Sequence, residues 1–459
     1  MAELPRVVVA APATGQGKTT VATGLMAALA AAGHEVSGHK VGPDYIDPGY
    51  HALACGRAGR NLDPHLVGEH LVAPLLLHGA RTPRPADVAV VEGVMGLYDG
   101  RIGGAGFSST AHVAALTHTP VVLVVDISRS SRSVGAVVHG MATWDRSVEV
   151  AGVILNQAGS ARHADEVRSA IALPVLGVIP RDASIATPSR HLGLVTAAER
   201  GGSAAVVARL AEVVAEHVDL DAVLAIARSA PPLSIEPWSP SPPVVEVRRA
   251  PARSLETTTS RRPRVAVAAG RAFTFQYAET AELLAAHGCD VVSFDPAVDT
   301  ALPAGTAGLY LGGGFPEVHA ADLAANTPLL AEIREAVLDG LPTVAECAGL
   351  LYLCRTLDGA AMSGVLGADA EMTDRLTLRY PVATATSDTL LTRVGEEVTG
   401  HEFHRTTVAP SAGPTAAWHV DGQAIGFASS TLHASYLHTH WAGHPQLAAR
   451  FAEAVRAHA

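Results

Sequence analysis

The chain has 459 residues, of which 48% are hydrophobic and 17% charged, and its formal net charge is −11. This length is sufficient for two to three domains with real cores, and the composition excludes a disordered or collagen-like chain. The acidic balance argues against nucleic acid or an anionic membrane as the main partner.

The first half of the chain alternates short apolar runs with helical patterns. Runs rich in Val, Ile and Leu on both parities indicate strands that are buried on both faces, as in a parallel sheet flanked by helices. We predict helices at 18–32 and 204–229, and strands at 6–11, 35–41, 87–92, 120–126, 148–156 and 174–179.

The sequence shows no signal for secretion or membrane insertion. The N-terminal segment lacks the features of a signal peptide, and no apolar run approaches the roughly 20 residues that a membrane helix needs. The four cysteines, Cys55, Cys289, Cys347 and Cys354, form no disulfide framework and have no zinc spacing. We therefore expect a cytoplasmic protein.

A phosphate-binding loop is indicated between the first predicted strand and the first predicted helix. In the segment Ala11-Pro12-Ala13-Thr14-Gly15-Gln16-Gly17-Lys18-Thr19-Thr20, backbone N–H groups would wrap the phosphates of ATP and the lysine would reach the terminal ones. The usual first glycine is absent, because proline stands five positions before the second glycine. The predicted ATP-binding residues of this loop are Gly15, Gly17, Lys18, Thr19 and Thr20.

The lysine count points to a second functional position. Lys18 and Lys40 are the only lysines among 33 basic residues, so arginine supplies the general surface charge. A compact ammonium fits sites that a planar guanidinium does not. Lys40 ends a predicted strand, where an α/β sheet binds its ligands, and it suits a γ-phosphate or an acyl phosphate. Asp44 and Asp47 follow in a turn, and either suits Mg²⁺; the alternative is a turn with solvated carboxylates.

Two further polar residues follow predicted strands. Glu92 ends the apolar run 87–92 and precedes a glycine-containing loop, where a carboxylate contact to Mg²⁺ belongs. Asn156 is a candidate for reading an adenine edge, or else an ordinary turn residue. The predicted cofactor is Mg²⁺, and its candidate ligands are Thr19, Asp44 and Glu92.

The composition changes after residue 229. Residues 230–263 are rich in Pro, Ser, Thr and Arg and are predicted to form a linker. We expect a first domain at 1–229 and a second α/β domain at 264–459. In the second domain we predict a helix at 279–287 and strands at 265–269, 290–294, 309–311, 343–346 and 424–428.

A cysteine nucleophile is indicated in the second domain. Cys347 stands between a predicted strand and a helix with small residues on both sides, which permits a strained elbow, and a helix N-terminus favours its thiolate. Upstream, Gly313 and Gly314 offer backbone N–H groups for an oxyanion hole. His438 is the predicted base, and His440 is the less favoured choice.

Together these segments resemble the family of cobyrinate (hydrogenobyrinate) a,c-diamide synthases. The resemblance covers nearly the whole chain except the linker. The matching segments are the phosphate loop, 40–48, Gly59-Arg60-Asn61-Leu62-Asp63-Pro64, 91–100, 311–317, 345–350, Gly400-His401-Glu402-Phe403-His404 and 434–440. The combination of 40–48 with 91–100 is highly specific, whereas the phosphate loop alone is not.

The resemblance implies a first domain that is similar to dethiobiotin synthetase and binds ATP and the corrinoid, and a second domain of the class I glutamine amidotransferase type. It implies Cys347 as nucleophile and His438 as the residue that activates it. The substrates would be ATP, glutamine and a corrinoid polycarboxylate, whose a and c carboxylates are amidated through an acyl phosphate with ammonia released from glutamine. A protected path for ammonia is expected.

Two positions depart from the pattern. The glutamate usually found two residues after the histidine is replaced by His440, which leaves the third member of the Cys–His site unassigned. The segment Gly270-Arg271-Ala272-Phe273 lacks an expected aspartate before the Ala-Phe pair.

Other classes stay open at this point. Cobyric acid synthase and CTP synthase share the two chemistries, and a P-loop ATPase switch with an inactive amidotransferase domain is the non-enzymatic alternative. The sequence does not distinguish cobalt-bearing from cobalt-free substrate, the order of amidation, or a monomer from a homodimer.

Overall fold

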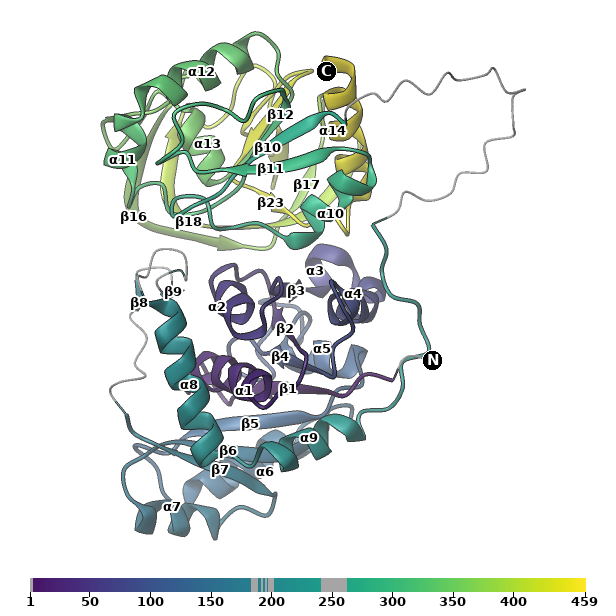
Figure 1. Cartoon of the computed structure of the whole chain (residues 1–459), viewed down its shortest axis with the longest axis vertical. Coiled ribbons are helices and arrows are strands. Elements are labelled where there is room, and N and C mark those ends of the chain that lie inside the picture. Colours follow the sequence, from purple (N-terminus) through teal and green to yellow (C-terminus); the bar gives the residue numbers. More distant parts are fainter. Residues whose placement is uncertain (1–2, 183–188, 191–192, 195, 197–201, 241–261) are drawn as a thin grey trace, which may run out of the picture. The chain divides into compact units, whose positions relative to one another are not determined.

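The computed structural model describes residues 3–182, 189–190, 193–194, 196, 202–240 and 262–459. It divides into two compact units, Met1–Trp238 and Ser239–Ala459 (Figure 1). No helix among the described residues is both long and apolar enough to cross a membrane.

The first unit is built on a seven-stranded parallel sheet in the order β3-β2-β4-β1-β5-β6-β7. Six strands were expected from their apolar runs, and the structure confirms them to within about two residues at each end. The added edge strand, β3, has three residues, too few for a periodic signal. The strands are β1 (Arg6–Ala10), β2 (Val36–Val41), β3 (Arg60–Leu62), β4 (Val88–Glu92), β5 (Val121–Asp126), β6 (Val150–Ala158) and β7 (Val175–Pro180).

Helices connect these strands. They are α1 (Lys18–Ala31), α2 (Ile46–Cys55), α3 (Pro64–Val67), α4 (Glu69–Arg81), α5 (Thr110–Leu116), α6 (Ser133–Thr143), α7 (Ala161–Arg168), α8 (Ser203–His217) and α9 (Leu220–Ser229). A short antiparallel pair, β8 (Ser189–Arg190) and β9 (Gly193–Leu194), precedes α8. The strands of the sheet are almost wholly buried, as the two-sided apolar pattern predicts.

The single helix expected at 204–229 is wrong, because two helices occupy this range. Val218 is extended and forms a bridge to Gly177, which interrupts the helical hydrogen bonds. Asp219 then begins α9 by accepting a hydrogen bond from the Ala222 N–H (2.9 Å). The first of these helices, α8, packs beside α1 (Figure 1), so closely that a Cβ on Gly24 would lie 2.6 Å from Val214.

The first part of the predicted linker packs on the first unit. Arg6 donates to the Pro231 carbonyl (2.6 Å), and Leu233 is buried. The Trp238 N–H donates to the Pro74 carbonyl (2.9 Å), and its indole meets His78 edge-on. The compact unit therefore extends to Trp238, while residues 241–261 of the predicted linker lie outside the described residues.

The second unit contains a six-stranded sheet in the order β11-β10-β12-β13-β22-β21. All its pairings are parallel except that of β21 with β22. The strands are β10 (Arg264–Ala268), β11 (Asp290–Phe294), β12 (Thr306–Leu311), β13 (Thr343–Glu346), β21 (Phe427–Ala428) and β22 (Leu432–Ser435). The helices are α10 (Ala278–Ala286), α11 (Ala320–Ala325), α12 (Thr327–Leu338), α13 (Ala348–Leu353) and α14 (Pro445–His458).

A second, eight-stranded sheet was not expected. Its long central pair, β16 (Asp369–Arg379) and β18 (Glu397–Ala409), is antiparallel and largely polar, so no apolar run marks it. The remaining strands are β14 (Thr356–Leu357), β15 (Ala360–Ala361), β17 (Val382–Thr384), β19 (Trp418–Val420), β20 (Gln423–Ile425) and β23 (His438–Thr439), the last pairing with β18.

The strand expected at 424–428 is split between the two sheets. Gly426 separates β20 from β21 with φ +74°, and a Cβ there would lie 2.4 Å from the Ala434 carbonyl oxygen. The chain turns at this glycine because a larger residue would be strained and would clash with β22.

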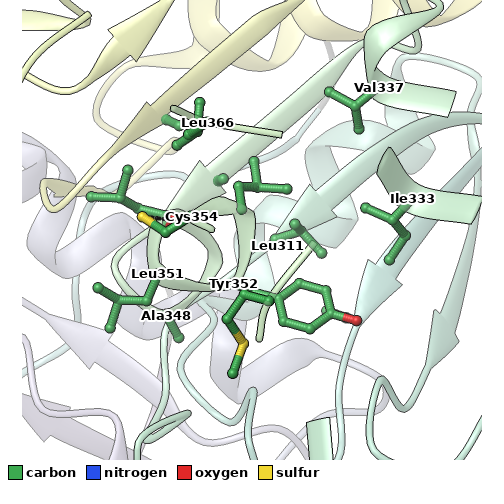
Figure 2. Close-up of a cluster of buried hydrophobic side chains, with 14 of the residues drawn as sticks. Leu311, Ile333, Val337, Ala348, Leu351, Tyr352, Cys354 and Leu366 are labelled. Carbon is green, nitrogen blue, oxygen red and sulfur yellow. Dashed lines mark hydrogen bonds between the residues drawn. The ribbon is translucent and has the colours of Figure 1, made fainter. Parts of the chain in front are cut away.

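The core of the second unit forms around α13, between the parallel sheet and its helices. Figure 2 shows Leu351 and Tyr352 of α13, and Cys354 directly after it, packed near Leu311 of β12, with Ile333 and Val337 of α12 on the same cluster. Since α13 begins directly after Cys347, this packing fixes the helix that follows the candidate nucleophile.

Candidate active sites

The phosphate loop follows β1 and ends at the first residue of α1. Gly15 and Gly17 have φ of +83° and +89°, which favour glycine. At Gly17 space is also restricted, because a Cβ would lie 2.2 Å from Nδ2 of Asn156. That amide donates to the Gln16 carbonyl (3.0 Å), and the Gln16 side chain accepts from the Asp126 N–H (2.8 Å). The ends of β5 and β6 thus hold the loop.

Lys18 is buried at the start of α1. Its Nζ donates to the carbonyl oxygens of Ala13 (3.3 Å) and Met95 (2.5 Å). Burial and the nearby Lys40 lower the pKa of Lys18 to about 8, although Glu92, Asp47 and Asp99 act in the opposite direction. These two carbonyls are neutral partners, so the ammonium can exchange them for the oxygens of a phosphate, which carry negative charge and bind it more strongly.

Thr19 lies in a buried cluster that joins α1, β2, α2 and β4. Its hydroxyl donates to Oε1 of Glu92 (2.5 Å) and is 3.3 Å from Oδ2 of Asp47. Lys40 bridges the two carboxylates, with Nζ at 2.7 Å from Asp47 and 2.9 Å from Glu92. His51 completes the cluster, its Nε2 lying 2.7 Å from Oε2 of Glu92. The sequence analysis did not single out His51, because a lone histidine in a helix carries no motif.

The two carboxylates of this cluster differ in their surroundings. Burial would raise the pKa of Glu92, but Lys40, His51 and Thr19 together lower it well below its ordinary value. Burial, Asp44 and Glu92 raise the pKa of Asp47, against the effect of Lys40. Burial would lower the pKa of Lys40, and its carboxylate neighbours raise it instead. The two carboxylates therefore favour the charged form of Lys40.

The remaining predicted residues of this site have other contacts. Oδ1 of Asp44 accepts from the N–H groups of Ile46 (2.7 Å) and Asp47 (3.0 Å), so this carboxylate caps α2. Asn156 is 2% exposed, and its buried Oδ1 has no hydrogen-bond partner in the described structure. Its contacts favour a role in holding the loop over the expected reading of adenine. Thr20 lies half-buried in the first turn of α1.

The donor set fits Mg²⁺. Thr19, Glu92 and Asp47 bring a hydroxyl and two carboxylates together, and Mg²⁺ prefers oxygen ligands. The described residues contain no group of three or more His, Cys, Asp and Glu side chains able to hold a metal by themselves. This agrees with a metal that is bound through few carboxylates together with phosphates.

The second candidate site is an elbow between β13 and α13. Cys347 has φ +50° and ψ −98°, a strained conformation for a residue with a side chain. Its N–H donates to the Ser435 carbonyl of β22 (2.8 Å). Gly349 permits the sharp turn, because a Cβ there would lie 2.3 Å from the Leu311 carbonyl oxygen. The sequence prediction of an elbow describes this geometry.

His438 lies against Cys347 from β23, and it is 2% exposed. Burial would lower the pKa of His438, but hydrogen bonding to Cys347 and Glu346 and the charges of both raise it to about 9. Nδ1 of His438 is 3.7 Å from Oε2 of Glu346. A thiol and an imidazole held together in this way can form a thiolate–imidazolium pair, which is the reactive form of a cysteine nucleophile.

The two candidate oxyanion glycines are not equivalent. The Gly313 N–H donates to the Phe275 carbonyl (3.1 Å), and Phe275 returns a hydrogen bond to Gly313 (3.0 Å). The expectation that this N–H lies bare is therefore wrong. At Gly314 a Cβ would lie 2.0 Å from the Ala272 carbonyl oxygen, so only glycine fits there. Its N–H and that of Ala348, directly after the cysteine, are the better candidates.

His440 occupies the position where the amidotransferase pattern has a glutamate. Its ring is tilted against that of Tyr277 with centroids 4.2 Å apart, and its Nε2 is 3.6 Å from Oε2 of Glu279. His440 is fully buried between these two residues. The structure thus gives it partners other than Cys347.

Comparison with known families assigns both units. Residues 7–195 match the model of the CobQ/CobB/MinD/ParA nucleotide binding domain. Residues 264–446 match the model of the CobB/CobQ-like glutamine amidotransferase domain. The matches contain the phosphate loop and the Cys–His elbow, respectively.

Full-length relatives agree with this order of domains. The chain is 61% identical to a hydrogenobyrinate a,c-diamide synthase of Thermobifida fusca, over 99% of this chain and 97% of that protein. It is 54% identical to the protein of that name in Streptomyces coelicolor, over 99% and 98%. It is 39% identical to a cobyrinate a,c-diamide synthase of Dehalococcoides mccartyi, over 97% of each.

Proposed function

The chain belongs to the family of cobyrinate and hydrogenobyrinate a,c-diamide synthases, and we propose that its two sites divide one amidation between them. It is an ATP-dependent, glutamine-hydrolysing amide ligase of cobalamin biosynthesis. The observation that carries the division is that each unit holds one complete set of groups: a phosphate loop with two buried lysines in the first, and a Cys–His elbow in the second.

The second unit releases ammonia from glutamine. The Cys347 thiolate attacks the amide carbon, and the N–H groups of Gly314 and Ala348 stabilise the oxyanion that forms. His438 gives a proton to the departing nitrogen, so that ammonia leaves and a thioester remains. Water then hydrolyses the thioester to glutamate, with His438 taking one proton from the water and returning it to the cysteine.

The first unit activates the acceptor. A carboxylate oxygen of the corrinoid attacks the γ-phosphorus of ATP, which gives an acyl phosphate and ADP. Ammonia then attacks the acyl carbon, phosphate leaves, and the nitrogen loses one proton to give the amide. Lys18 neutralises the phosphates, and Lys40, held by Asp47 and Glu92, faces the transferred group. The sequence of steps runs twice, once at each acetate group.

Magnesium would accompany ATP in this site. Thr19, Glu92 and Asp47 would hold it, and it would supply charge neutralisation at the phosphates. Asp44 caps α2 and keeps Asp47 in place through its N–H contact. A cytoplasmic location follows from the need for ATP and glutamine and agrees with four unpaired cysteines.

We assign the cobalt-free hydrogenobyrinate as the acceptor. The support is that the relatives of 61% and 54% identity carry that name, whereas the relative of 39% identity is a cobyrinate enzyme. The test is turnover of each corrinoid with ATP, Mg²⁺ and glutamine, followed by mass. A gain of two amides on hydrogenobyrinate and little reaction of cobyrinate is expected; preference for cobyrinate would overturn the assignment.

A further inference from the structure

The catalytic histidine lacks the orienting glutamate that its neighbours in sequence would supply. In a Cys–His site, a third group usually fixes the tautomer and orientation of the imidazole and stabilises its charged form. Residue 440 cannot do this as an anion, since it is histidine, and its ring packs on Tyr277 beside Glu279. The orienting charge on His438 must come from elsewhere in the fold.

Glu346 is the carboxylate that meets His438. It is the last residue of β13, directly before the nucleophile, and only 4% of it is exposed. Its Oε2 is 3.7 Å from Nδ1 of His438. Since β13 ends beside β22, and the chain continues from β22 into β23, the glutamate and the histidine are brought together by the sheet.

The carboxylate of Glu346 is itself held in place. Oε1 accepts from the Thr439 hydroxyl (2.9 Å), which in turn accepts from the Trp441 indole N–H (3.1 Å). Oε2 accepts from the Tyr310 hydroxyl (3.1 Å), and burial together with this contact with Glu346 raises the pKa of the tyrosine. Two hydroxyl donors, from β12 and β23, therefore fix the anion before glutamine binds, which is how an orienting group is built.

We propose that Glu346 is the positioning residue of the Cys347–His438 pair and takes the part of the missing glutamate after the histidine. Its negative charge keeps the proton on Nδ1 of His438 and leaves Nε2 for the thiol and the departing nitrogen. Nε2 lies on the side of the glycine loop, since a Cβ on Gly313 would be 3.2 Å from it. The third member of the site thus precedes the nucleophile in the chain instead of following the base.

The other groups around His438 make a local anion necessary. His401 of β18 stacks on it with ring centroids 4.8 Å apart. Burial, and to a smaller extent the charge of His438, lower the pKa of His404 to about 4, so this ring also lies near His438. Tyr277 contacts His401 from the loop before α10. These neighbours offer imidazoles and a phenol, so the charges that favour the imidazolium are those of Glu346 and Cys347.

This inference rests on the proposed function of the second unit, and glutamine hydrolysis in the wild type tests that function first. In Glu346→Gln we expect the kcat of glutamine hydrolysis to fall roughly 10- to 100-fold with little change in KM, because the reacting pair loses its orienting charge. Glu346→Asp retains the charge at a longer distance and should recover part of the loss.

A second readout does not depend on turnover. Alkylation of Cys347 by iodoacetamide reports its thiolate, provided that Cys347→Ser serves as the blank for the three other thiols. In Glu346→Gln the alkylation profile should move to higher pH by about one unit, because the imidazolium that favours the thiolate is weakened. A residue with a purely structural role would lower the melting temperature without moving this profile.

Glu279→Gln is the matched control, since it removes the charge of another buried carboxylate near a histidine of the same unit. We expect it to change kcat by less than about threefold and to leave the alkylation profile in place. A wild-type chain without glutaminase activity would overturn the proposed function. An active wild type with an unchanged profile and kcat in folded Glu346→Gln would overturn the inference alone.

Discussion

The two sites use the same architectural position in opposite ways. Each lies where a parallel strand ends and a helix begins. In the first unit Lys40 contacts Asp47 and Glu92, and Lys18 contacts two backbone carbonyls, so protein oxygens hold both cations. In the second unit Cys347, His438 and Glu346, which we propose to be nucleophile, base and orienting group, already lie together.

The difference follows from what each site must bring into place. A nucleotide carries several negative charges, so its site needs cations that are kept in position by temporary partners until the ligand arrives. The amide of glutamine is neutral, and its site must generate its own charged pair. In the first unit we therefore expect activity to fall even when one cation replaces another of different shape. In the second unit we expect the effect of a substitution to depend on whether glutamine or ammonium supplies the nitrogen.

Cys347→Ser should give the largest effect. A hydroxyl lacks the nucleophilicity of the thiolate at neutral pH, so glutamine-dependent synthesis should fall by on the order of 10⁴-fold. Synthesis with high ammonium at raised pH should persist, because activation belongs to the first unit. Diamide formation with each nitrogen source measures both. Loss with ammonium as well, in a folded variant, would contradict the division of labour.

Lys18→Arg should reduce ATP-dependent synthesis roughly a thousandfold, because a planar guanidinium does not fit the loop that holds the ammonium. Basal glutaminase activity should remain. Phosphate release and glutamate release, measured on the same sample, separate the two effects. Normal synthase turnover would exclude the phosphate-loop assignment.

Lys40→Arg should lower amide formation by about a hundredfold while ATP still binds. The reason is that Nζ lies between two buried carboxylates at 2.7 and 2.9 Å, where a guanidinium would push them apart. Oxygen exchange between the substrate carboxylate and phosphate reports the acyl phosphate. If the variant exchanged oxygen at the wild-type rate, Lys40 would have a purely structural role.

The pH dependence should distinguish the units further. Because the pKa of His438 is raised to about 9, its proton is retained in the fold up to that pH. The stability that the bound proton of His438 contributes to the folded state is fully present below the ordinary histidine pKa and is lost as pH rises through about 9. Glutaminase kcat/KM should therefore fall above pH 9 by about tenfold per unit. A decline that begins near pH 6.5 would show that the imidazolium is not held.

His440→Ala should have the smallest effect, a loss of only about threefold in glutamine hydrolysis. The contacts of its ring are with Tyr277 and Glu279, so we expect its removal to act on the reacting pair only indirectly. The comparison is with His438→Ala, which should match Cys347→Ser. Equal losses in both histidine variants would mean that His440 belongs to the reacting group.

The parts of the fold that could be predicted are those with strong local signals. Apolar runs such as 120–126 gave the parallel strands, because both faces of these strands are buried. The pair β16–β18 was missed, since both strands include many polar residues and the side chains of β16 are mostly exposed or half-buried. The break at Val218 was missed because the apolar pattern continues across it, and tertiary contact with Gly177 decides the conformation.

The sites show the same limit. Lys18, Lys40 and Cys347 stand in local motifs, so the sequence could place them at strand ends. Glu346 carries no such signal, because a carboxylate at the end of an apolar strand looks like a boundary residue until the histidine of another strand meets it. Partners that the fold brings together across 92 positions of chain are beyond what spacing alone can predict.

The near absence of lysine has a consequence for chemical labelling. The two lysines are 8% and 3% exposed, so the outer surface of the described chain presents arginine in place of reactive amines. An amine-directed ester should therefore modify the two lysine ammonium groups slowly, and Lys18, with a pKa of about 8, should react before Lys40. Because ATP would shield Lys18, protection from acylation gives a direct titration of nucleotide occupancy in the intact enzyme, without any engineered reporter.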